Sequence, residues 1–222
     1  MPVYNERATI ETAIERVLDT AHSIEGLDLV VVDDGSTDGT RELLTARSWP
    51  VNVRVFEHDR NRGKGAALRT GLAQATAEFC TVMDADLEYD PSNFGELLAP
   101  LLAGEADAVY GVRGFRAHSA YSFWYVIGNK AVTLAANVLF NAWLSDLMTC
   151  QKVLKTALFR ELPLRANGFA IEAEITARLL RADARIFEVP ITYRARRREE
   201  GKKLAPIDGL RVLATLARCR IR

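Results

Sequence analysis

Two clusters of acidic side chains each follow a short apolar segment. The segment Leu29–Val32 leads into Asp33 and Asp34, and the segment Phe79–Met83 leads into the run 84–88, Asp-Ala-Asp-Leu-Glu. An apolar, β-branched run that stops at polar residues is typical of a buried parallel strand. Because the carboxyl ends of parallel strands lie along one edge of a sheet, we expect both clusters at the same edge.

Carboxylates gathered at one edge repel one another unless a cation neutralises them. The two clusters offer hard oxygen ligands and neither His nor Cys, a donor set that suits Mg²⁺ or Mn²⁺ carrying a substrate diphosphate. Aspartates at strand ends also cap turns in many proteins, and the residues alone leave that alternative open for each of them. Two clusters in matching positions favour the metal.

Two glycine-containing turns suggest anion binding less specifically. The segment 34–39, Asp-Gly-Ser-Thr-Asp-Gly, follows a strand, but the chain has neither the glycine pattern of Rossmann dinucleotide sites nor that of P-loops. Hydride transfer and P-loop chemistry are therefore disfavoured. The turn Arg60–Gly65 supplies cations and flexible backbone before a helix, so it could hold an anion, and a solvated basic turn is the alternative.

Helix and strand patterns alternate along the first half of the chain. The opening residues, 1–6, have the pattern of a strand end and a turn with no strand before them, so we expect a first strand that is cut short. Thr37 or Asp38 is expected to cap the second helix. The alternation predicts an α/β domain with a largely parallel central sheet. The predicted helices are Thr9–Ala21, Gly39–Ala46, Lys64–Ala75 and Phe94–Leu102, and the predicted strands are Leu29–Val32, Val51–Glu57, Phe79–Met83 and Ala108–Gly111.

The second half of the chain is more apolar. Asn129, Lys130 and Asn137 interrupt its most apolar stretch, residues 119–144, whereas a membrane span needs about 20 nearly uncharged residues. We expect a buried or interfacial helix there and no membrane span. The remaining predicted elements are a helix at Ala170–Arg181, a strand at Arg185–Tyr193 and a helix at Gly209–Ala217.

Composition sets broad limits. The 222 residues are 49% hydrophobic and 26% charged with no net charge, which fits one globular domain and gives no overall basic field to attract nucleic acid. The charge is uneven, however, because residues 194–222 contain ten Lys or Arg against three acids. Three widely spaced cysteines fit a reducing compartment, so we expect a cytoplasmic protein without disulfides.

The order of the motifs resembles a known enzyme family. The chain is similar to the family 2 glycosyltransferases and, among them, to the dolichol-phosphate mannose synthase group, which transfers sugars to polyprenyl phosphates. The resemblance covers nearly the whole chain and implies the glycosyltransferase A fold, an α/β fold with a mostly parallel sheet flanked by helices. It is carried by the segments 2–6 (Pro-Val-Tyr-Asn-Glu), 32–40 (Val-Asp-Asp-Gly-Ser-Thr-Asp-Gly-Thr), 61–65 (Asn-Arg-Gly-Lys-Gly), 83–87 (Met-Asp-Ala-Asp-Leu) and 189–193 (Val-Pro-Ile-Thr-Tyr).

The resemblance implies roles for individual residues. Asp86 would ligate the metal, joined by Glu88. Arg113, Arg196 and Lys202 would act on the phosphates during catalysis, and Asp86 would act on them through the metal. The donor, a nucleotide diphosphate sugar, would be bound by Pro2, Tyr4, Glu6, Val32, Asp34, Lys64, Asp84, Ala85 and Asp86.

The chain departs from the family pattern at two places. Glu88 stands where close relatives often carry Gln or Ser, which adds a negative charge and should tighten metal binding. The segment 146–152 keeps the family's Asp146 but lacks its usual Gly-Phe-Arg, which puts acceptor handling by that segment in doubt.

These residue types fit one reaction. We expect an inverting, metal-dependent transferase that moves a sugar from a nucleotide diphosphate to polyprenyl phosphate, with GDP-mannose as first donor and UDP-glucose or UDP-N-acetylglucosamine left open. A metal with Arg and Lys neutralises the departing diphosphate. A phosphate acceptor is already anionic near neutral pH, so no strong general base is needed.

Two alternatives remain open from the sequence. The same fold could transfer to a saccharide hydroxyl, which needs a carboxylate base such as Asp146 or Glu174. The chain could instead be an inactive protein that binds nucleotide sugars, although intact Asp84, Asp86 and Arg113 disfavour this.

We expect the protein to rest on the cytoplasmic face of a membrane without spanning it. Arg211, Arg218, Arg220 and Arg222 accompany the apolar positions Leu210, Leu213 and Leu216 of the last predicted helix. Residues 1–118 would form the nucleotide-sugar half of the single catalytic domain, 1–222, and residues 119–222 its acceptor half. Aromatic residues that suit a membrane interface, with core packing as the alternative, are Tyr121, Phe123, Trp124, Tyr125 and Trp143.

Overall fold

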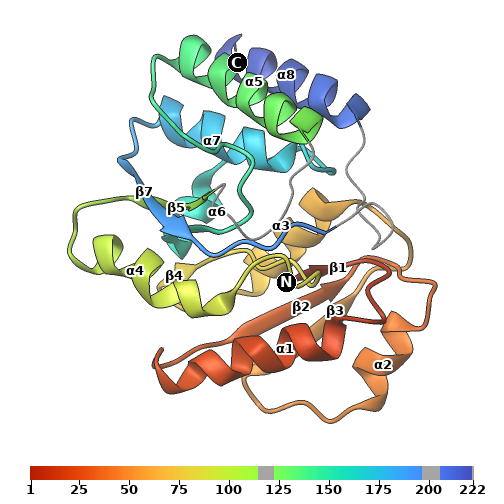
Figure 1. Cartoon of the computed structure of the whole chain (residues 1–222). Coiled ribbons are helices and arrows are strands. Elements are labelled where there is room, and N and C mark those ends of the chain that lie inside the picture. Colours follow the sequence, from red (N-terminus) through yellow and green to blue (C-terminus); the bar gives the residue numbers. More distant parts are fainter. Residues whose placement is uncertain (115–122, 197–205, 222) are drawn as a thin grey trace.

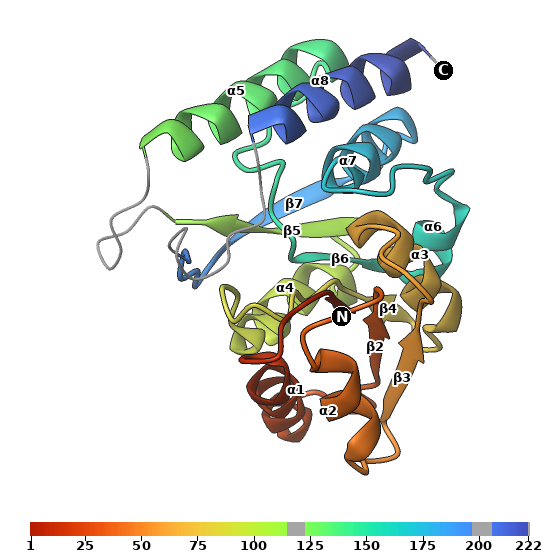
Figure 2. The ribbon, with the colours of Figure 1, turned by 90° about the vertical axis from the view of Figure 1, so that its right-hand side faces the viewer.

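The first 74 residues form a parallel three-stranded sheet with helices on both sides. In the computed structural model, which describes residues 1–114, 123–196 and 206–221, the strand order is β1-β2-β3. Right-handed crossovers place α1 and α2 on one side of this sheet and α3 on the other (Figures 1 and 2). The elements are β1 (Pro2–Val3), α1 (Ile10–Asp19), a 3₁₀ turn (Thr20–His22), β2 (Leu29–Asp33), α2 (Thr40–Ala46), β3 (Val53–Glu57) and α3 (Lys64–Gln74).

The next strands form a second, mixed sheet in the order β4-β6-β5-β7. Strand β6 is antiparallel to both of its neighbours, and β5 and β7 are parallel. One continuous hydrophobic core joins the two sheets, with Val31 and Tyr110 fully buried in it. The elements are β4 (Phe79–Cys80), a 3₁₀ turn (Pro91–Asn93), α4 (Phe94–Leu102), β5 (Ala108–Arg113), β6 (Lys152–Lys155), α6 (Thr156–Glu161) and β7 (Ile186–Ile191).

Most predicted elements are confirmed to within a few residues, but three local expectations are wrong. The strand expected at Phe79–Met83 pairs only at its first two residues, because the following residues of β6, Val153 and Lys152, pair with β5 alone. Strand β6 and helix α6 are additional, since four residues with a lysine at each end carry no readable alternation. Helix α2 has Gly39 as its N-cap, although the Asp38 carboxylate accepts a hydrogen bond from the Thr40 amide at 3.0 Å.

Three helices form a layer over the second sheet. Figures 1 and 2 show α5 (Phe123–Phe140) and α8 (Pro206–Ile221) side by side, with α7 (Ile171–Arg181) packed against both. A second hydrophobic cluster joins them. Its fully or nearly fully buried members are Val132, Ala136, Leu147, Ala173, Ala177, Val212, Leu216 and Cys219.

The buried face of α8 differs from the one expected. Val212, Leu216 and Cys219 face α5 and α7, whereas Leu210 and Leu213 are 64% and 40% exposed. The expectation that Leu210, Leu213 and Leu216 share one face is therefore wrong. Positions four and three residues apart define the buried stripe of a packed helix, and the packing of α8 selects the stripe that contains Cys219.

Helix α5 carries an exposed apolar stripe. Phe123, Ile127, Leu134 and Val138 recur at helical spacing on its surface, and each is at least 46% exposed. Within the described ranges, no helix combines the length and apolar character that crossing a bilayer requires.

We predict that Leu216→Ala lowers the free energy of unfolding by about 2–5 kcal/mol, because the substitution leaves a cavity in the three-helix cluster. Leu210→Ala, on the same helix but exposed, should change it by less than about 0.5 kcal/mol. Urea denaturation of both variants measures the difference. Equal losses would contradict this description of α8.

Candidate active site

The turns after β1 and β2 are fastened to each other by side chains. The Asn5 amide donates to the Ser36 hydroxyl at 2.9 Å, and the Asn5 carboxamide oxygen accepts from the Thr37 amide at 2.8 Å. The Glu6 amide donates to the Thr40 hydroxyl at 3.0 Å. Asn5 adopts a φ of +51°, a conformation that Asn tolerates better than most residues. The turn that carries Tyr4 and Glu6 is thus fixed relative to the first acidic cluster.

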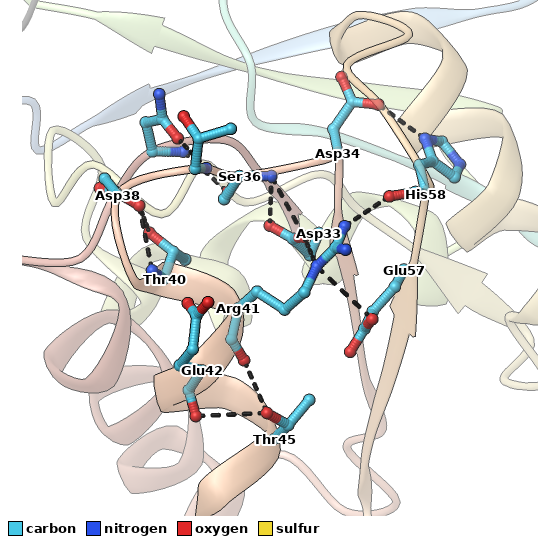
Figure 3. Close-up of polar contacts among 12 residues, drawn as sticks. Asp33, Asp34, Ser36, Asp38, Thr40, Arg41, Glu42, Thr45, Glu57 and His58 are labelled. Carbon is cyan, nitrogen blue, oxygen red and sulfur yellow. Dashed lines mark hydrogen bonds and ion pairs between the residues drawn. The ribbon is translucent and has the colours of Figure 1, made fainter.

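Asp33 organises structure rather than facing open space. Its side chain is fully buried and accepts hydrogen bonds from the Ser36 amide at 3.3 Å and from Arg41 Nε at 3.0 Å (Figure 3). The Arg41 guanidinium also lies 3.5 Å from Glu57 and donates to the His58 carbonyl. Asp33 therefore caps a turn, which is the alternative that the sequence left open for each aspartate.

Asp34 holds the basic turn against the sheet. One carboxylate oxygen contacts His58 Nδ1 at 2.6 Å (Figure 3). The same oxygen accepts from the Arg62 amide at 2.9 Å, and the other accepts from the Gly63 amide at 2.7 Å. His58 in turn contacts the Thr70 hydroxyl through Nε2 at 2.9 Å. Both oxygens of the carboxylate therefore have protein partners.

Most amides at the end of the basic turn have protein partners. The amides of Arg62 and Gly63 bind Asp34, and those of Gly65 and Ala66 donate to the Asn167 carbonyl at 2.6 and 3.4 Å. Gly63 has a φ of +94°, and a side chain there would collide with the Asn167 backbone. These four amides are therefore not available to an anion, and anion binding by the cations of the turn stays a prediction.

A chain of buried charges links the second acidic cluster to the other half of the molecule. Lys64 Nζ lies 2.9 Å from an Asp84 oxygen and 3.1 Å from a Glu172 oxygen, and Lys152 Nζ lies 2.6 Å from the second Glu172 oxygen. Burial lowers the pKa of Lys64, but the two carboxylates outweigh it and raise the pKa well above its usual value. Burial raises the pKa of Asp84, but the Lys64 ammonium outweighs that effect, so the net shift is downward.

Within the acidic cluster 84–88, Asp86 is the carboxylate whose charge neighbouring cations neutralise least. Its Oδ1 accepts from the Glu88 amide at 3.0 Å, across Leu87, which has a φ of +62°. Burial, followed by repulsion from Asp84 and Glu88, raises the pKa of Asp86 to about 7. A left-handed non-glycine residue between two acidic residues is a strained arrangement of the kind found at functional sites.

Glu88 connects this cluster to the segment after β7. Its carboxylate accepts from the Tyr193 hydroxyl at 2.5 Å and from the Arg196 amide at 2.6 Å. Burial and the neighbouring Glu88 raise the pKa of Tyr193, so the phenol keeps its proton and donates. Tyr193 was not among the residues assigned a role from sequence, although it ends the segment 189–193 that carries the family resemblance.

Arg196 bridges the opening turn and the acidic cluster. Its Nε donates to the Asp86 carbonyl at 2.6 Å, and its terminal nitrogens lie 3.0 and 3.1 Å from the Glu6 carboxylate. Arg196, which the resemblance assigns to the phosphates, therefore lies beside Asp86, which it assigns to the metal. Lys202 lies outside the described residues.

Arg113 forms a separate, tightly held pair. Its guanidinium contacts both Asp146 oxygens at 2.7 and 2.8 Å, and it lies 5.1 Å from the centre of the Tyr193 ring. Asn129 also donates to Asp146 at 3.0 Å. Burial raises the pKa of Asp146, but Arg113 outweighs this and the net shift is downward. A carboxylate held ionised in this way is a weak base.

The other candidate base, Glu174, is engaged as well. Its carboxylate is 1% exposed and accepts from the amides of Arg165 and Ala166 at 2.8 and 2.6 Å. It thereby fixes the loop that closes over the start of α3. Neither Asp146 nor Glu174 presents an unengaged carboxylate to an acceptor.

Three of the remaining predicted donor residues lie in or after strands with little exposed side chain or at a strand edge. Val32 and Ala85 are 1% and 2% exposed, and Pro2 belongs to β1. The structure thus brings together Glu6, Lys64, Asp84, Asp86, Glu88 and Arg196 from segments far apart in the chain.

The donor set of this cluster fits a divalent cation that a substrate completes. Across the described ranges, no three His, Cys, Asp or Glu side chains converge as a ready-made metal cage. Mg²⁺ is commonly held by one or two carboxylates together with substrate phosphates. Asp86, which is partly buried and has two acidic neighbours, matches that arrangement.

Comparison with known proteins identifies the family. The family model described as glycosyl transferase family 2 matches residues 1–163. The chain belongs to glycosyl transferase family 2. Its fold is accordingly the glycosyltransferase A fold, and it is an enzyme of the glycosyltransferase class.

The curated relatives include transferases whose names refer to lipid phosphates. An undecaprenyl-phosphate 4-deoxy-4-formamido-L-arabinose transferase of Pseudomonas paraeruginosa is 31% identical over 77% of this chain and 53% of its own length. A dolichol-phosphate mannosyltransferase of Pyrococcus furiosus is 27% identical over 91% of this chain and 57% of its own length. The chain therefore spans little more than half of these two relatives.

A solved structure matches nearly the whole chain. Glucosyl-3-phosphoglycerate synthase of Mycobacterium tuberculosis, in complex with Mn²⁺, UDP and glucosyl-3-phosphoglycerate, has a TM-score of 0.75 and 25% identity. The match covers 98% of this chain and 77% of that protein.

For this family 2 chain we predict that the Asp86 carboxyl titrates near pH 7 when no metal is present. The unfolded carboxyl ionises near pH 4, so the free energy of unfolding should fall as pH rises from about 4 to about 7. Glu88→Gln should lower the pKa of Asp86 by removing one repelling charge. Carboxyl ¹³C NMR measures this, with Asp107, whose pKa Arg185 lowers, as internal reference. Titration of Asp86 near pH 4 would contradict the prediction.

Proposed function

We propose that this protein is an inverting, metal-dependent glycosyltransferase that moves a sugar from a nucleotide diphosphate to polyprenyl phosphate. The observation that carries the proposal is the contact of Arg196 with both Glu6 and the Asp86 backbone, which sets a cation beside an acidic cluster. The names of the relatives that act on undecaprenyl phosphate and dolichol phosphate support the acceptor.

The donor would lie against the first half of the chain, residues 1–118. Tyr4 and Glu6, with the backbone of Pro2 and Val32, line the ends of β1 and β2, and Asp34 keeps the basic turn in place beside them. Lys64 holds Asp84 ionised, so that Asp84 and Ala85 meet the ribose and phosphate as a fixed unit. GDP-mannose is the first donor to test, and UDP-sugars follow because the solved neighbour binds UDP.

Asp86 is the proposed ligand of Mg²⁺ or Mn²⁺. The metal, when bound, neutralises the charge that develops on the leaving diphosphate. Glu88 could join Asp86 only by exchanging its contacts with Tyr193 and the Arg196 amide. Such an exchange would release the segment around Arg196, which would let Arg196 and Lys202 adjust to the phosphates.

The acceptor would meet the second half, residues 119–222. A phosphate oxygen needs no general base, and the engagement of both Asp146 and Glu174 favours a phosphate over a saccharide hydroxyl as nucleophile. Arg113, fixed by Asp146 and covering the Tyr193 ring, and Arg196 would orient the two anionic substrates.

The outer face of α5 and α8 would rest on the cytoplasmic side of a membrane that contains the acceptor. The apolar stripe of α5 is accompanied by exposed Trp124 and Trp143, which are 78% and 88% exposed. On α8, the cations Arg211, Arg218 and Arg220 are exposed. Aromatic and basic residues together are typical of helices that lie on anionic bilayers.

We predict that purified protein transfers labelled mannose from GDP-mannose, or a sugar from UDP-glucose or UDP-N-acetylglucosamine, to undecaprenyl or dolichyl phosphate in the presence of Mn²⁺ or Mg²⁺. The anomeric configuration of the product should be inverted when NMR is used to determine it. Transfer should stop in excess EDTA and in Asp86→Asn, because the leaving diphosphate is no longer neutralised.

The matched control is Asp107→Asn, which removes a carboxylate engaged with Arg185 on the surface and should keep nearly full activity. The unphosphorylated polyprenol should accept no sugar. Transfer to the polyprenol, or full activity in EDTA, would reject the proposed mechanism, and donor hydrolysis without transfer to any lipid would reject the acceptor.

We further predict that the protein pellets with phosphatidylglycerol vesicles and not with phosphatidylcholine vesicles at low salt. Each arginine near an anionic surface contributes about 1 kcal/mol, an attraction that is screened over roughly 8 Å at physiological ionic strength. The triple change of Arg211, Arg218 and Arg220 to Gln should abolish pelleting. A control variant with Arg16, Arg47 and Arg185 changed to Gln loses the same charge and should still pellet. Equal loss of pelleting in both variants would contradict the assignment of α8 to the membrane surface.

A further inference from the structure

Polar side chains of α5 fasten this helix to the segment 144–147. The Asn137 carboxamide donates to the Leu144 carbonyl and accepts from the Leu144 amide, both at 2.9 Å. Lys130 Nζ donates to the Ser145 carbonyl at 3.0 Å. Two of the three polar residues that interrupt the apolar stretch of the sequence therefore bind the backbone of this segment.

Asn129, the third of these residues, binds a side chain instead. Its Nδ2 donates to Asp146 Oδ1 at 3.0 Å, and the same oxygen accepts from Arg113 Nη2 at 2.8 Å. The second Asp146 oxygen accepts from Arg113 Nε at 2.7 Å and from the Arg113 amide at 3.3 Å. Asn129 thus contacts the carboxylate that holds Arg113.

Other groups hold the backbone on either side of this carboxylate. A Glu188 oxygen accepts from the Ser145 amide at 2.7 Å and from the Asp146 amide at 3.4 Å, and the Thr133 hydroxyl accepts from the Leu147 amide at 3.2 Å. The torsion about the last bond of an aspartate side chain has broad minima, so a fixed backbone does not by itself fix the plane of the carboxylate. Hydrogen bonds to its two oxygens set that plane.

We propose that Asn129 is a positioning residue, which fixes the plane of the Asp146 carboxylate and thereby the direction in which Arg113 meets the acceptor phosphate. This inference rests on the proposed function. The Arg113 side chain is 16% exposed and that of Asp146 is 4% exposed, so the cation is the more accessible member of the pair. A bidentate arginine–carboxylate pair has a defined geometry, so the carboxylate aims the guanidinium.

Helix α5 would also place this pair relative to the bilayer. Asn129 is about half a helical turn away from Ile127 and Leu134, which belong to the exposed apolar stripe, so it lies on the opposite side of the helix. One side of α5 would therefore rest on the membrane while the other aims the cation. An acceptor anchored in that membrane would present its phosphate to a guanidinium whose direction the same helix sets.

The experiment compares Asn129→Ala and Asn129→Gln with a matched control, Asn137→Ala. The control removes an asparagine of the same helix that binds the backbone of the same segment. Asn129→Ala should raise the KM for undecaprenyl phosphate by about tenfold, because a hydrogen bond to a charged group is lost, and leave the KM for the nucleotide sugar within about twofold. Asn129→Gln, which keeps an amide donor, should recover most of this loss. The control should keep both KM values within about twofold of the wild type.

A second readout is independent of catalysis. The ¹H–¹⁵N NMR signal of Arg113 Nε, assigned by its disappearance in Arg113→Lys, reports on the hydrogen bond to Asp146. Exchange of this proton with water should be about tenfold faster in Asn129→Ala than in the wild type. In Asn137→Ala it should be unchanged.

The inference is overturned if Arg113 Nε exchanges equally in Asn129→Ala and in the wild type. It is also overturned if, in a protein that transfers sugar, Asn129→Ala and Asn137→Ala change the KM for the acceptor equally, because Asn129 would then only stabilise the segment. If the wild type transfers no sugar to a polyprenyl phosphate, the proposed function fails, and the Arg113 signal by itself decides the role of Asn129.

Discussion

Buried charge that must be paired is the constraint on which the arrangement of this molecule depends. Lys64 and Lys152 share Glu172 between them, and Lys64 also binds Asp84, so two cations and two carboxylates alternate through the interior. Removing one partner of such a set leaves an uncompensated buried charge, which typically costs about 3–5 kcal/mol. The chain of charges therefore fixes α3, β6 and the start of α7 relative to the segment at Asp84.

A second set of contacts, less deeply buried, builds the site on that base. Glu88 holds the segment after β7 through Tyr193 and Arg196, and Arg196 reaches the Glu6 carboxylate of the opening turn. Asp86, lying among these groups, has a raised pKa because of burial and of repulsion from Asp84 and Glu88. The site therefore has an excess of acidic side chains, which is the property expected of a centre completed by a cation and an anionic substrate.

The helical layer on the second sheet divides its side chains between two environments. Leu216 and Cys219 pack with α5 and α7, while the stripe of α5 that begins at Phe123 stays exposed. Apolar area removed from water contributes about 25 cal/mol per Å² to stability. An exposed apolar stripe beside basic side chains is therefore unfavourable in water and costs little free energy at a membrane surface.

The sequence by itself determined most helices and strands and the two turns that carry the acidic clusters. Apolar runs such as Leu29–Val32 and the helical spacing of α1 are local patterns, and local patterns fix local conformation. The motif order was enough to predict the family, and it named Glu6, Asp86 and Arg196, which the structure brings together. Tertiary structure alone decided which of the named carboxylates have protein partners: Asp34 and Glu174 bind backbone amides, Asp146 binds Arg113, and Asp86 keeps a raised pKa. Partners between 8 and 33 residues apart supply those contacts, and no local pattern encodes them because hydrogen bonding and desolvation depend on what the fold places within a few ångströms.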